Sequence, residues 1–276
     1  MEKRIVQLLF SRYTLSKEEL NILRNNKELA LYTLCAIINL LIVYLVLIGF
    51  YFDVGLGLAY YIAFFYFFVS FVISLAGTFS ASRLNAVRLG EDQFGEVYKI
   101  ACSYAKTLGL KRVPRIYVKQ NGGVINAFAS YFFFKNYILI NSDIFDVAYL
   151  KNKDKDALSF VIAHEMAHIA YSHTKIWYNF GILFSKYIPF LSSALFRARE
   201  YSCDNVAGFL CPEGKHGIFI LLLGKHLYNN IDISAYLRQA KQTHGFFEFF
   251  GNLKSSHPVP VRRILALYGE DKERII

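Results

Sequence analysis

The longest hydrophobic stretches of the chain lie near its amino terminus. Residues 30 to 52 carry no charged side chain, Asp53 follows, and residues 54 to 82 are again free of charge. A membrane-spanning helix needs about 20 mostly apolar residues, and both runs are longer than that. The pattern therefore predicts a transmembrane helical hairpin that reverses next to Asp53, with two buried core helices as the alternative.

Beyond residue 83 the pattern becomes that of an α+β domain that is mostly helical. Helical spacing from Leu84 to Leu108 is followed by short strand-like segments at 114–119, 124–134 and 137–140, separated by turn residues. Short segments of this kind, rich in aromatic and β-branched residues, are typical of strands. We expect the three segments to form a small antiparallel sheet.

A further helix is predicted from Ala157 to about His173, with Asp154 or Asp156 as its amino-terminal cap. Two later apolar segments, 176–196 and 217–228, are ambiguous. A lysine and a proline interrupt the first of them. Its interpretations are a third membrane span, a re-entrant hairpin or a pair of buried helices.

Basic residues flank the two apolar runs but are absent from the turn between them. Six lie in the leader, and Arg83 and Arg88 follow the second run. Cytoplasmic flanks of membrane helices carry an excess of Lys and Arg, so both ends of the hairpin are predicted to face the cytoplasm. The chain then divides into a cytoplasmic leader at 1–29, two membrane helices at 30–82 and a cytoplasmic domain at 83–276.

The composition also favours an integral membrane protein. Hydrophobic residues make up 55% of the 276 residues and charged residues 19%, with a mean hydropathy of +0.31, which excludes a disordered chain. The four cysteines are scattered without a C-x-x-C pair, so a reducing compartment is the simpler interpretation. The net charge of +10 accompanies no nucleic-acid recognition motif, and a domain beside anionic lipid accounts for it.

The strongest chemical motif is the H-E-x-x-H sequence of residues 164–168. Residues four apart lie one turn apart on the same helix face, so His164 and His168 can bind one Zn²⁺. Glu165 lies beside that face and can act as a base toward a water molecule at the metal. The alternative is a helix with two surface histidines that bind no metal. On a continuing helix His173 points away from His164, which places it behind the ligands or at the surface.

A third protein ligand must come from another segment. Glu200 and Asp204 begin an otherwise apolar helix and share one of its faces, so one can bind the metal while the other orients a ligand imidazole. A salt bridge from Glu200 to Arg197 or Arg199 is the alternative role. The other candidate ligands are Glu213, His216, His226, His244, Glu248 and His257.

Four motifs in this order resemble those of the HtpX-like membrane zinc peptidases, which are relatives of the CAAX prenyl endopeptidases. The motifs are N-A-F-A at 126–129, H-E-x-x-H at 164–168, R-x-x-E-x-x-x-D at 197–204, and His257-Pro258 with Arg263-Ile264. The resemblance covers about residues 84–268 and extends to the two apolar runs. Two departures, Ser130-Tyr131 after N-A-F-A and Phe196 before the third motif, concern only details of substrate contact.

The resemblance implies four kinds of site residue. The ligands of a Zn²⁺ ion would be His164, His168 and Glu200. The catalytic residues would be Glu165 as general base and His257 near the oxyanion. The residues that support a ligand histidine would be Asp204 and Arg263. The edge strand that pairs with the substrate backbone would be Asn126, Ala127, Phe128 and Ala129.

We therefore predict an integral, multi-pass membrane zinc endopeptidase with a zincin-like domain on the cytoplasmic face, in the inner membrane if its source is bacterial. Its partners would be the lipid bilayer and protein or peptide substrates, membrane proteins in quality control above all, and no nucleic acid. Two alternatives remain: a signalling sensor-protease with one dedicated substrate, and a non-catalytic membrane scaffold. The intact ligands and base argue against the scaffold.

Overall fold

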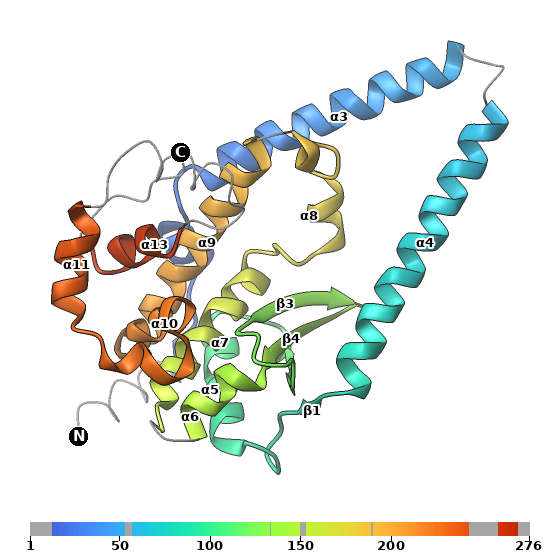
Figure 1. Ribbon diagram of the computed structural model, residues 1–276. Coiled ribbons are helices and arrows are strands. Elements are labelled where there is room, and N and C mark those ends of the chain that lie inside the picture. Colours follow the sequence, from blue (N-terminus) through green and yellow to red (C-terminus); the bar gives the residue numbers. More distant parts are fainter. Residues whose placement is uncertain are drawn as a thin grey trace.

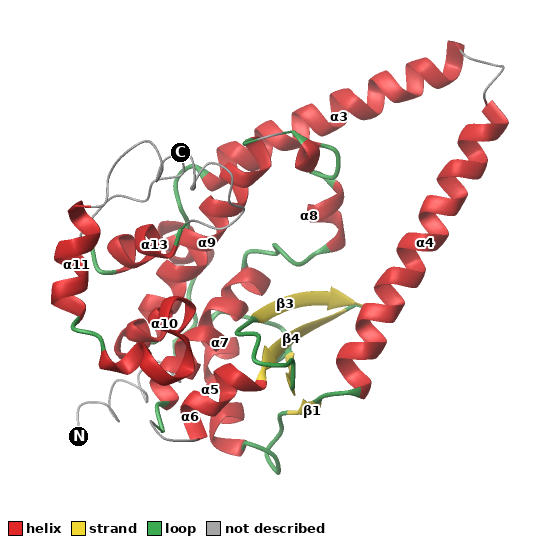
Figure 2. Cartoon of the chain, viewed as in Figure 1, coloured by secondary structure: helices red, strands yellow, loops and turns green. Residues whose placement is uncertain are grey.

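The computed structural model describes residues 13–52, 57–132, 134–149, 153–188, 190–242 and 259–269. In this part of the chain the fold is mostly helical with one small mixed sheet (Figure 1 and Figure 2). The described elements are, in chain order, α2 (Lys17–Leu23), α3 (Glu28–Phe52), α4 (Gly57–Leu84), β1 (Val87–Arg88), α5 (Gly95–Thr107), β2 (Arg115–Lys119), β3 (Ala127–Phe132), β4 (Lys135–Asn141), α6 (Ser142–Tyr149), α7 (Lys155–Ala170), α8 (Ile176–Phe180), η1 (Ser185–Tyr187), α9 (Leu191–Leu210), η2 (Pro212–Phe219), α10 (Ile220–Leu227), η3 (Tyr228–Asn230), α11 (Ile233–Gln242) and α13 (Pro260–Leu267).

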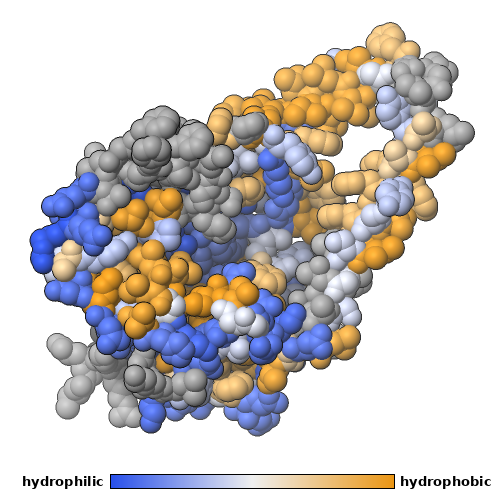
Figure 3. Space-filling model, viewed as in Figure 1, coloured by the Kyte–Doolittle hydropathy of each residue, from blue (hydrophilic) through white to orange (hydrophobic). Residues whose placement is uncertain are grey.

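The two longest helices, α3 and α4, project from the body of the protein, and their surfaces are mostly hydrophobic (Figure 3). In α3 the stretch Glu28–Gly49 is long and apolar enough to cross a membrane. In α4 the apolar stretch identified in the same way, Ala59–Ser74, is shorter. Among the described residues one helix meets the criteria for a span, so the predicted hairpin of two is not confirmed. The predicted turn at Asp53 lies outside the described residues.

The ambiguous segment 176–196 lies beside α3 and contains only short helical pieces before α9 begins. Asn39, a polar residue inside α3, holds this segment through its side-chain amide. The amide donates to the backbone oxygen of Phe180 (3.2 Å) and accepts from the backbone N–H of Phe184 (2.8 Å). With five residues in α8 and three in η1, neither piece is long enough to span a membrane.

The sheet has the strand order β1-β2-β4-β3. The predicted antiparallel arrangement is wrong for one pair, because β2 and β4 run parallel while β1–β2 and β3–β4 run antiparallel. The cause is the apolar sequence of β4, in which Ile138 and Ile140 are fully buried. This strand takes the centre of the sheet, and its hairpin with β3 leaves β3 at the edge.

The helix predicted from Leu84 to Leu108 is also corrected. It is three elements, since α4 ends at Leu84, β1 follows, and α5 begins only at Gly95. The glycine and charged residues at 90–92 form the connection. This break matters for the site because β1 extends the sheet on the side away from β3.

The core centres on α7, which packs against α9, α5, α6, η2 and β3. The side chain of Asp154 caps the helix by accepting from the N–H of Ala157 (2.9 Å). The helix ends at Ala170, three residues before the predicted end, because Ser172 adopts a left-handed backbone (φ 65°). The second site helix, α9, extends nine residues before Glu200, so Glu200 lies in its middle and does not begin it.

Candidate metal centre

The crossing of α7 and α9 brings His164, His168 and Glu200 together. Nε2 of His164 lies 3.5 Å from one carboxylate oxygen of Glu200, and Nε2 of His168 lies 3.5 Å from the other. The two histidines lie one turn apart on α7, so their rings meet edge to face with centroids 5.0 Å apart. The structure thus places the three predicted ligands in one cluster.

The donor set fits zinc. A tetrahedral Zn²⁺ with bonds of about 2.0–2.2 Å to nitrogen and oxygen separates its ligand atoms by about 3.3–3.6 Å. The two measured distances of 3.5 Å lie within that range. Two imidazoles and one carboxylate are the ligands of catalytic zinc sites, which keep a fourth position for water or substrate.

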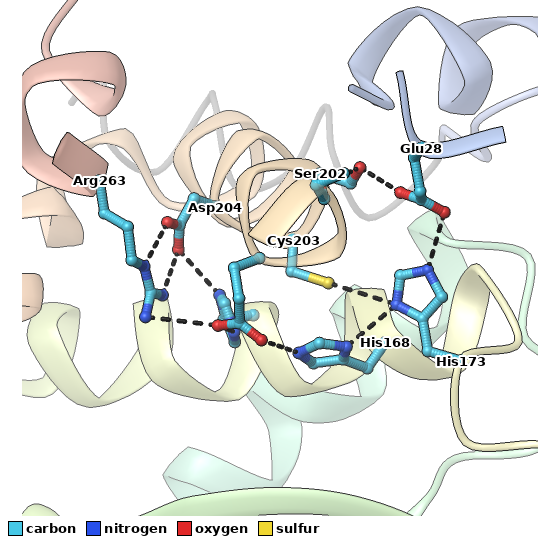
Figure 4. A network of polar contacts seen from close by, with 10 residues as sticks. Glu28, His168, His173, Ser202, Cys203, Asp204 and Arg263 are labelled. Carbon is cyan, nitrogen blue, oxygen red and sulfur yellow. Dashed lines mark hydrogen bonds and ion pairs between the residues drawn. The ribbon is translucent and has the colours of Figure 1, made fainter. Parts of the chain in front are cut away.

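On one side of the cluster, Asp204 and Arg263 support His164. Nδ1 of His164 lies 2.9 Å from Oδ1 of Asp204. Arg263 donates from Nε and Nη2 to the two oxygens of the same carboxylate, each at 2.7 Å, and its Nη1 lies 3.3 Å from Glu200 (Figure 4). A second carboxylate on the far nitrogen fixes the ring orientation of a metal-binding histidine.

On the other side, His173 and Glu28 support His168. Nδ1 of His173 lies 3.0 Å from Nδ1 of His168, and Nε2 of His173 lies 3.0 Å from the Glu28 carboxylate, which Ser202 also contacts (Figure 4). One proton arrangement satisfies all of these groups: His173 donates from Nε2 to Glu28 and accepts at Nδ1 from His168. His168 then keeps the lone pair of Nε2, the atom that faces Glu200, for a metal.

The residues that contact His164 and His168 on their outer sides differ in their effect on charge. Burial alone would lower the pKa of His164, but the hydrogen bonds and charges of Asp204 and Glu200 outweigh it and raise this pKa to about 10. Burial lowers the pKa of His173 to about 4, and its bond with Glu28 opposes only part of that effect. The surroundings of His164 therefore favour a positive charge, as a bound cation would supply, whereas those of His173 favour a neutral ring.

The cluster faces a cleft of about 850 Å³. Glu165 lines it, 7% exposed, next to the ligand His164 on α7. The predicted substrate segment Asn126–Ala129, together with Ser130, lines the same cleft. A carboxylate base, a three-ligand metal position and an edge strand thus share one cavity, which is the arrangement that hydrolysis of an extended peptide needs.

The register of β3 shows which of its backbone groups face outward. The N–H of Asn141 donates to the oxygen of Asn126 (2.9 Å), one step before the first β3–β4 pair. Hydrogen-bonded and non-hydrogen-bonded pairs alternate in an antiparallel ladder. Ala127 and Ala129 therefore direct their N–H and C=O groups away from β4, toward the edge that no other described strand occupies.

The structure distinguishes the predicted metal ligands from some of the other candidate residues. Among the described residues, two groups of three side chains could hold a metal: the predicted cluster, and His168 with His173 and Cys203. Three competing candidates join neither group: Glu213 is exposed, His216 pairs with Asp154, and His226 is exposed on α10. The remaining candidates, His244, Glu248 and His257, lie outside the described residues, so the predicted catalytic role of His257 stays a prediction.

Sequence reasoning missed the contribution of Glu28 and left His173 undecided. The early end of α7 turns His173 back toward His168, and its N–H donates to the His168 oxygen (2.9 Å). Glu28 comes from 145 positions earlier in the chain. Its only sequence signal is a carboxylate two residues before a long apolar run.

Two comparisons with known proteins match this picture. Residues 91–178, which include His164 to His168, match peptidase family M48. A protease HtpX homolog of Helicobacter pylori strain J99 is 25% identical over 209 residues. The aligned region is 62% of this chain and 66% of that relative, just under two thirds of its length. No solved structure matches the chain.

Proposed function

Because the family match and the relative support an HtpX-like M48 metallopeptidase, we propose that this chain is a zinc-dependent endopeptidase held in a membrane. The observation that carries the proposal is the cluster of His164, His168 and Glu200 with Glu165 beside it in one cleft. When bound, zinc supplies a Lewis acid that polarises a carbonyl and acidifies a water molecule.

The residues of the cleft have separate roles in the reaction. His164, His168 and Glu200 bind and orient the ion through the atoms that face one another. Glu165 accepts a proton from the attacking water at its carboxylate and returns it to the leaving amine nitrogen. The outward backbone groups of Ala127 and Ala129 pair with an extended substrate and set its register.

The chemistry is tested with Glu165→Gln in the full-length protein, purified in detergent. Gln keeps the size of the side chain and removes the base, so the protein should retain about one zinc per chain. Its casein cleavage should fall by about 10²–10⁴-fold. Glu213→Gln, a change at an exposed glutamate, is the matched control and should cleave casein like wild type. Equal cleavage by Glu165→Gln and wild type would contradict this mechanism and favour the scaffold.

The substrate strand is tested with proline. Ala127→Pro and Ala129→Pro remove outward N–H donors and leave the β3–β4 ladder intact, as an edge strand permits. Cleavage of a short peptide should fall about tenfold or more at equal zinc content, given the loss of one buried hydrogen bond or more. Ser130→Pro removes an inward donor and should instead lower the stability of the fold. Unchanged peptide kinetics in both alanine variants would place the substrate elsewhere.

We propose that the peptidase domain faces the cytoplasm and acts on membrane proteins in quality control. The support is the basic leader before α3 and the absence of basic residues near Asp53. In a background without native cysteines, a cysteine at position 53 should react with an impermeant reagent added outside intact cells, and one at position 153 should not. The reverse labelling pattern would place the catalytic domain on the outer side.

A further inference from the structure

Arg199 is a buried cation in the wall of the substrate cleft. It precedes the ligand Glu200 on α9 and is only 5% exposed. Its guanidinium lies over the ring of Tyr178, 4.5 Å from the centroid, and over that of Phe196 at 5.0 Å. The Tyr178 hydroxyl hydrogen-bonds to the same group. Two aromatic rings and one hydroxyl thus hold the guanidinium in place.

One edge of this guanidinium has no partner. Nε and Nη2 of Arg199 are buried and make no hydrogen bond. These two N–H groups point in parallel and form the fork that receives both oxygens of a carboxylate. Arg263 in this protein uses the same two atoms to bind Asp204, at 2.7 Å each. Among the described residues, no carboxylate forms an ion pair with Arg199.

A second polar atom in the same cleft is also unsatisfied. The hydroxyl oxygen of Thr174 is buried without a hydrogen bond, and Thr174 lines the cleft with Arg199. Buried polar groups without partners are rare in folded proteins, and an unpaired buried charge is the most costly kind. Arg199 and Thr174 both line the cleft that the metal-binding cluster faces, and a ligand that brings its own oxygen atoms would satisfy them.

We propose that Arg199 and Thr174 form a subsite of the substrate cleft that binds a carboxylate of the peptide being cleaved. The inference rests on the proposed peptidase function and adds a substrate class to it. The carboxylate belongs either to an Asp or Glu side chain or to the free carboxyl terminus of the substrate. The planar fork of arginine matches a carboxylate in both cases, and a peptide amide lacks the second acceptor oxygen and the charge.

The position on α9 limits where this carboxylate lies along the substrate. Neighbouring Cα atoms are about 3.8 Å apart, and an extended peptide advances about 3.3–3.6 Å per residue. Because Arg199 directly precedes the metal ligand Glu200 on the chain, we expect the bound carboxylate within about three residues of the bond that is cut. The cleft should therefore prefer a carboxylate at one particular position of the substrate, and it should not prefer acidic peptides in general.

The test uses full-length protein in detergent and quenched fluorescent peptides that share one sequence cleaved by wild type. In one set, each peptide carries a single Glu at one of the three positions on either side of the cut. A neutral control peptide carries Gln at the same position. In the other set the peptide is shortened from its carboxyl terminus and ends in a free carboxylate or an amide. The first set reports on side-chain carboxylates and the second on the terminal one.

At one position, the carboxylate peptide should show a kcat/KM at least about tenfold above its neutral match. Arg199→Lys keeps the charge but removes the fork, and this ratio should fall toward one. Thr174→Val, a change of similar size, should lower it less. Arg238→Lys, at an exposed arginine of α11, is the matched control and should leave the ratio unchanged.

Binding to Glu165→Gln separates failure of the subsite from failure of the proposed function. Fluorescence anisotropy of labelled peptides on this variant measures affinity without turnover. If wild type cleaves no peptide, the proposed function fails, and the affinity ratio of carboxylate to amide peptides still tests the subsite. Equal values for carboxylate and neutral peptides at every position, or a preference that Arg199→Lys leaves intact, would overturn the inference.

Discussion

The two ligand histidines of the H-E-x-x-H motif are supported in opposite ways. His164 is bound by Asp204, which Arg263 of α13 holds from the carboxyl-terminal part of the chain. His168 is bound by His173, which leads to Glu28 at the start of α3. The sequence motif does not distinguish the two histidines. In the structure, however, one is connected through His173 to a residue from the early part of the sequence and the other contacts residues from its later part.

The two supports also differ in their electrostatics. Burial alone would raise the pKa of Asp204, but the charge and hydrogen bonds of Arg263 and the bond with His164 lower it. This support is a buried ion pair. The other is a neutral imidazole between His168 and a carboxylate, with its pKa lowered to about 4 by burial. Removal of one partner should therefore be more damaging on the Asp204 side, where the buried guanidinium of Arg263 loses its two shortest contacts.

The first prediction concerns this ion pair and has the largest expected effect. Asp204→Ala removes the two shortest contacts of the buried Arg263 guanidinium, which keeps only the longer one to Glu200, and should cost about 3–5 kcal/mol of unfolding free energy. The midpoint of thermal unfolding should fall, and most of the zinc should be lost.

Asp146→Ala is its control. Asp146 pairs with Lys225, which keeps a second partner in Asp143, so the cost should stay within about 1 kcal/mol. Similar midpoints for Asp204→Ala and Asp146→Ala would show that the ion pair at the metal centre contributes no more than a surface pair does.

The second prediction concerns the neutral support. His173→Phe keeps a ring of similar volume but removes the acceptor for Nδ1 of His168, so zinc affinity should fall about 10–100-fold. Glu28→Gln should have a smaller effect. The double variant should be no weaker than His173→Phe, because Glu28 acts through His173. Competition with a chelator measures these affinities.

His216→Phe is the matched control for His173→Phe. His216 also pairs with a carboxylate, that of Asp154, but at the opposite end of α7. Its loss should leave zinc affinity unchanged. Additive losses in the double variant of His173 and Glu28 would mean that the two residues do not form one chain of contacts.

The third prediction concerns the link between α9 and the start of α3. The Ser202 hydroxyl contacts Glu28 and accepts from the backbone N–H of Asn25 (2.9 Å). Ser202→Ala should cost about 1 kcal/mol, the usual value of a buried hydrogen bond. The loss of zinc affinity should be only a few-fold by chelator competition. A loss as large as that of His173→Phe would mean that the docking of α3 dominates the site.

The side of the site around His164 could be predicted from the sequence, and the side around His168 could not. The i, i+4 spacing of the two histidines and of Glu200 with Asp204 fixes which side chains share a helix face, and the resemblance supplied Arg263. His173 required knowledge of where α7 ends, which depends on a left-handed Ser172 that no spacing rule indicates. Glu28 and Arg199 required the packing of α3, α8 and α9, which is tertiary.

The fold, like the site, could be predicted from the sequence only where the signals are local. The strands β2, β3 and β4 were predicted within a few residues, because alternation and turn residues are local signals, whereas β1 lies in a segment that was predicted as helix. The pairing of β2 with β4 was predicted in the wrong direction, because strand order depends on which strand buries most apolar surface. The apolar run that became α3 was predicted, whereas the second span was not confirmed.

The last and smallest prediction uses the His216–Asp154 pair as a contrast to His173–Glu28. Burial alone would raise the pKa of Asp154, but its hydrogen bonds with His216, the N–H of Ala157 and the Tyr228 hydroxyl lower it to about 2, from an ordinary 3.8. The bond with Asp154 raises the pKa of His216 above its ordinary 6.5. The same residue types thus raise the histidine pKa here, where His216 is partly exposed, whereas the pKa of His173 is lowered at the buried end of α7.

The direction of the pH dependence follows from these shifts. The stabilisation due to Asp154 is present above about pH 4 and is lost as the pH falls toward 2, because the unfolded state binds the proton first. The stabilisation due to His216 is present below about pH 6.5 and is lost as the pH rises through its folded pKa. The pair therefore contributes most between about pH 4 and 6.5.

Asp154→Asn keeps the helix cap and removes the charge, so the difference in unfolding midpoint from wild type should be largest in that window and shrink on both sides. Both proteins are compared with chelator present, which removes the pH dependence of zinc binding. A difference that stays constant from pH 4 to 9 would show that His216 is neutral in the folded protein, as His173 is, and the contrast between the two ends of α7 would disappear.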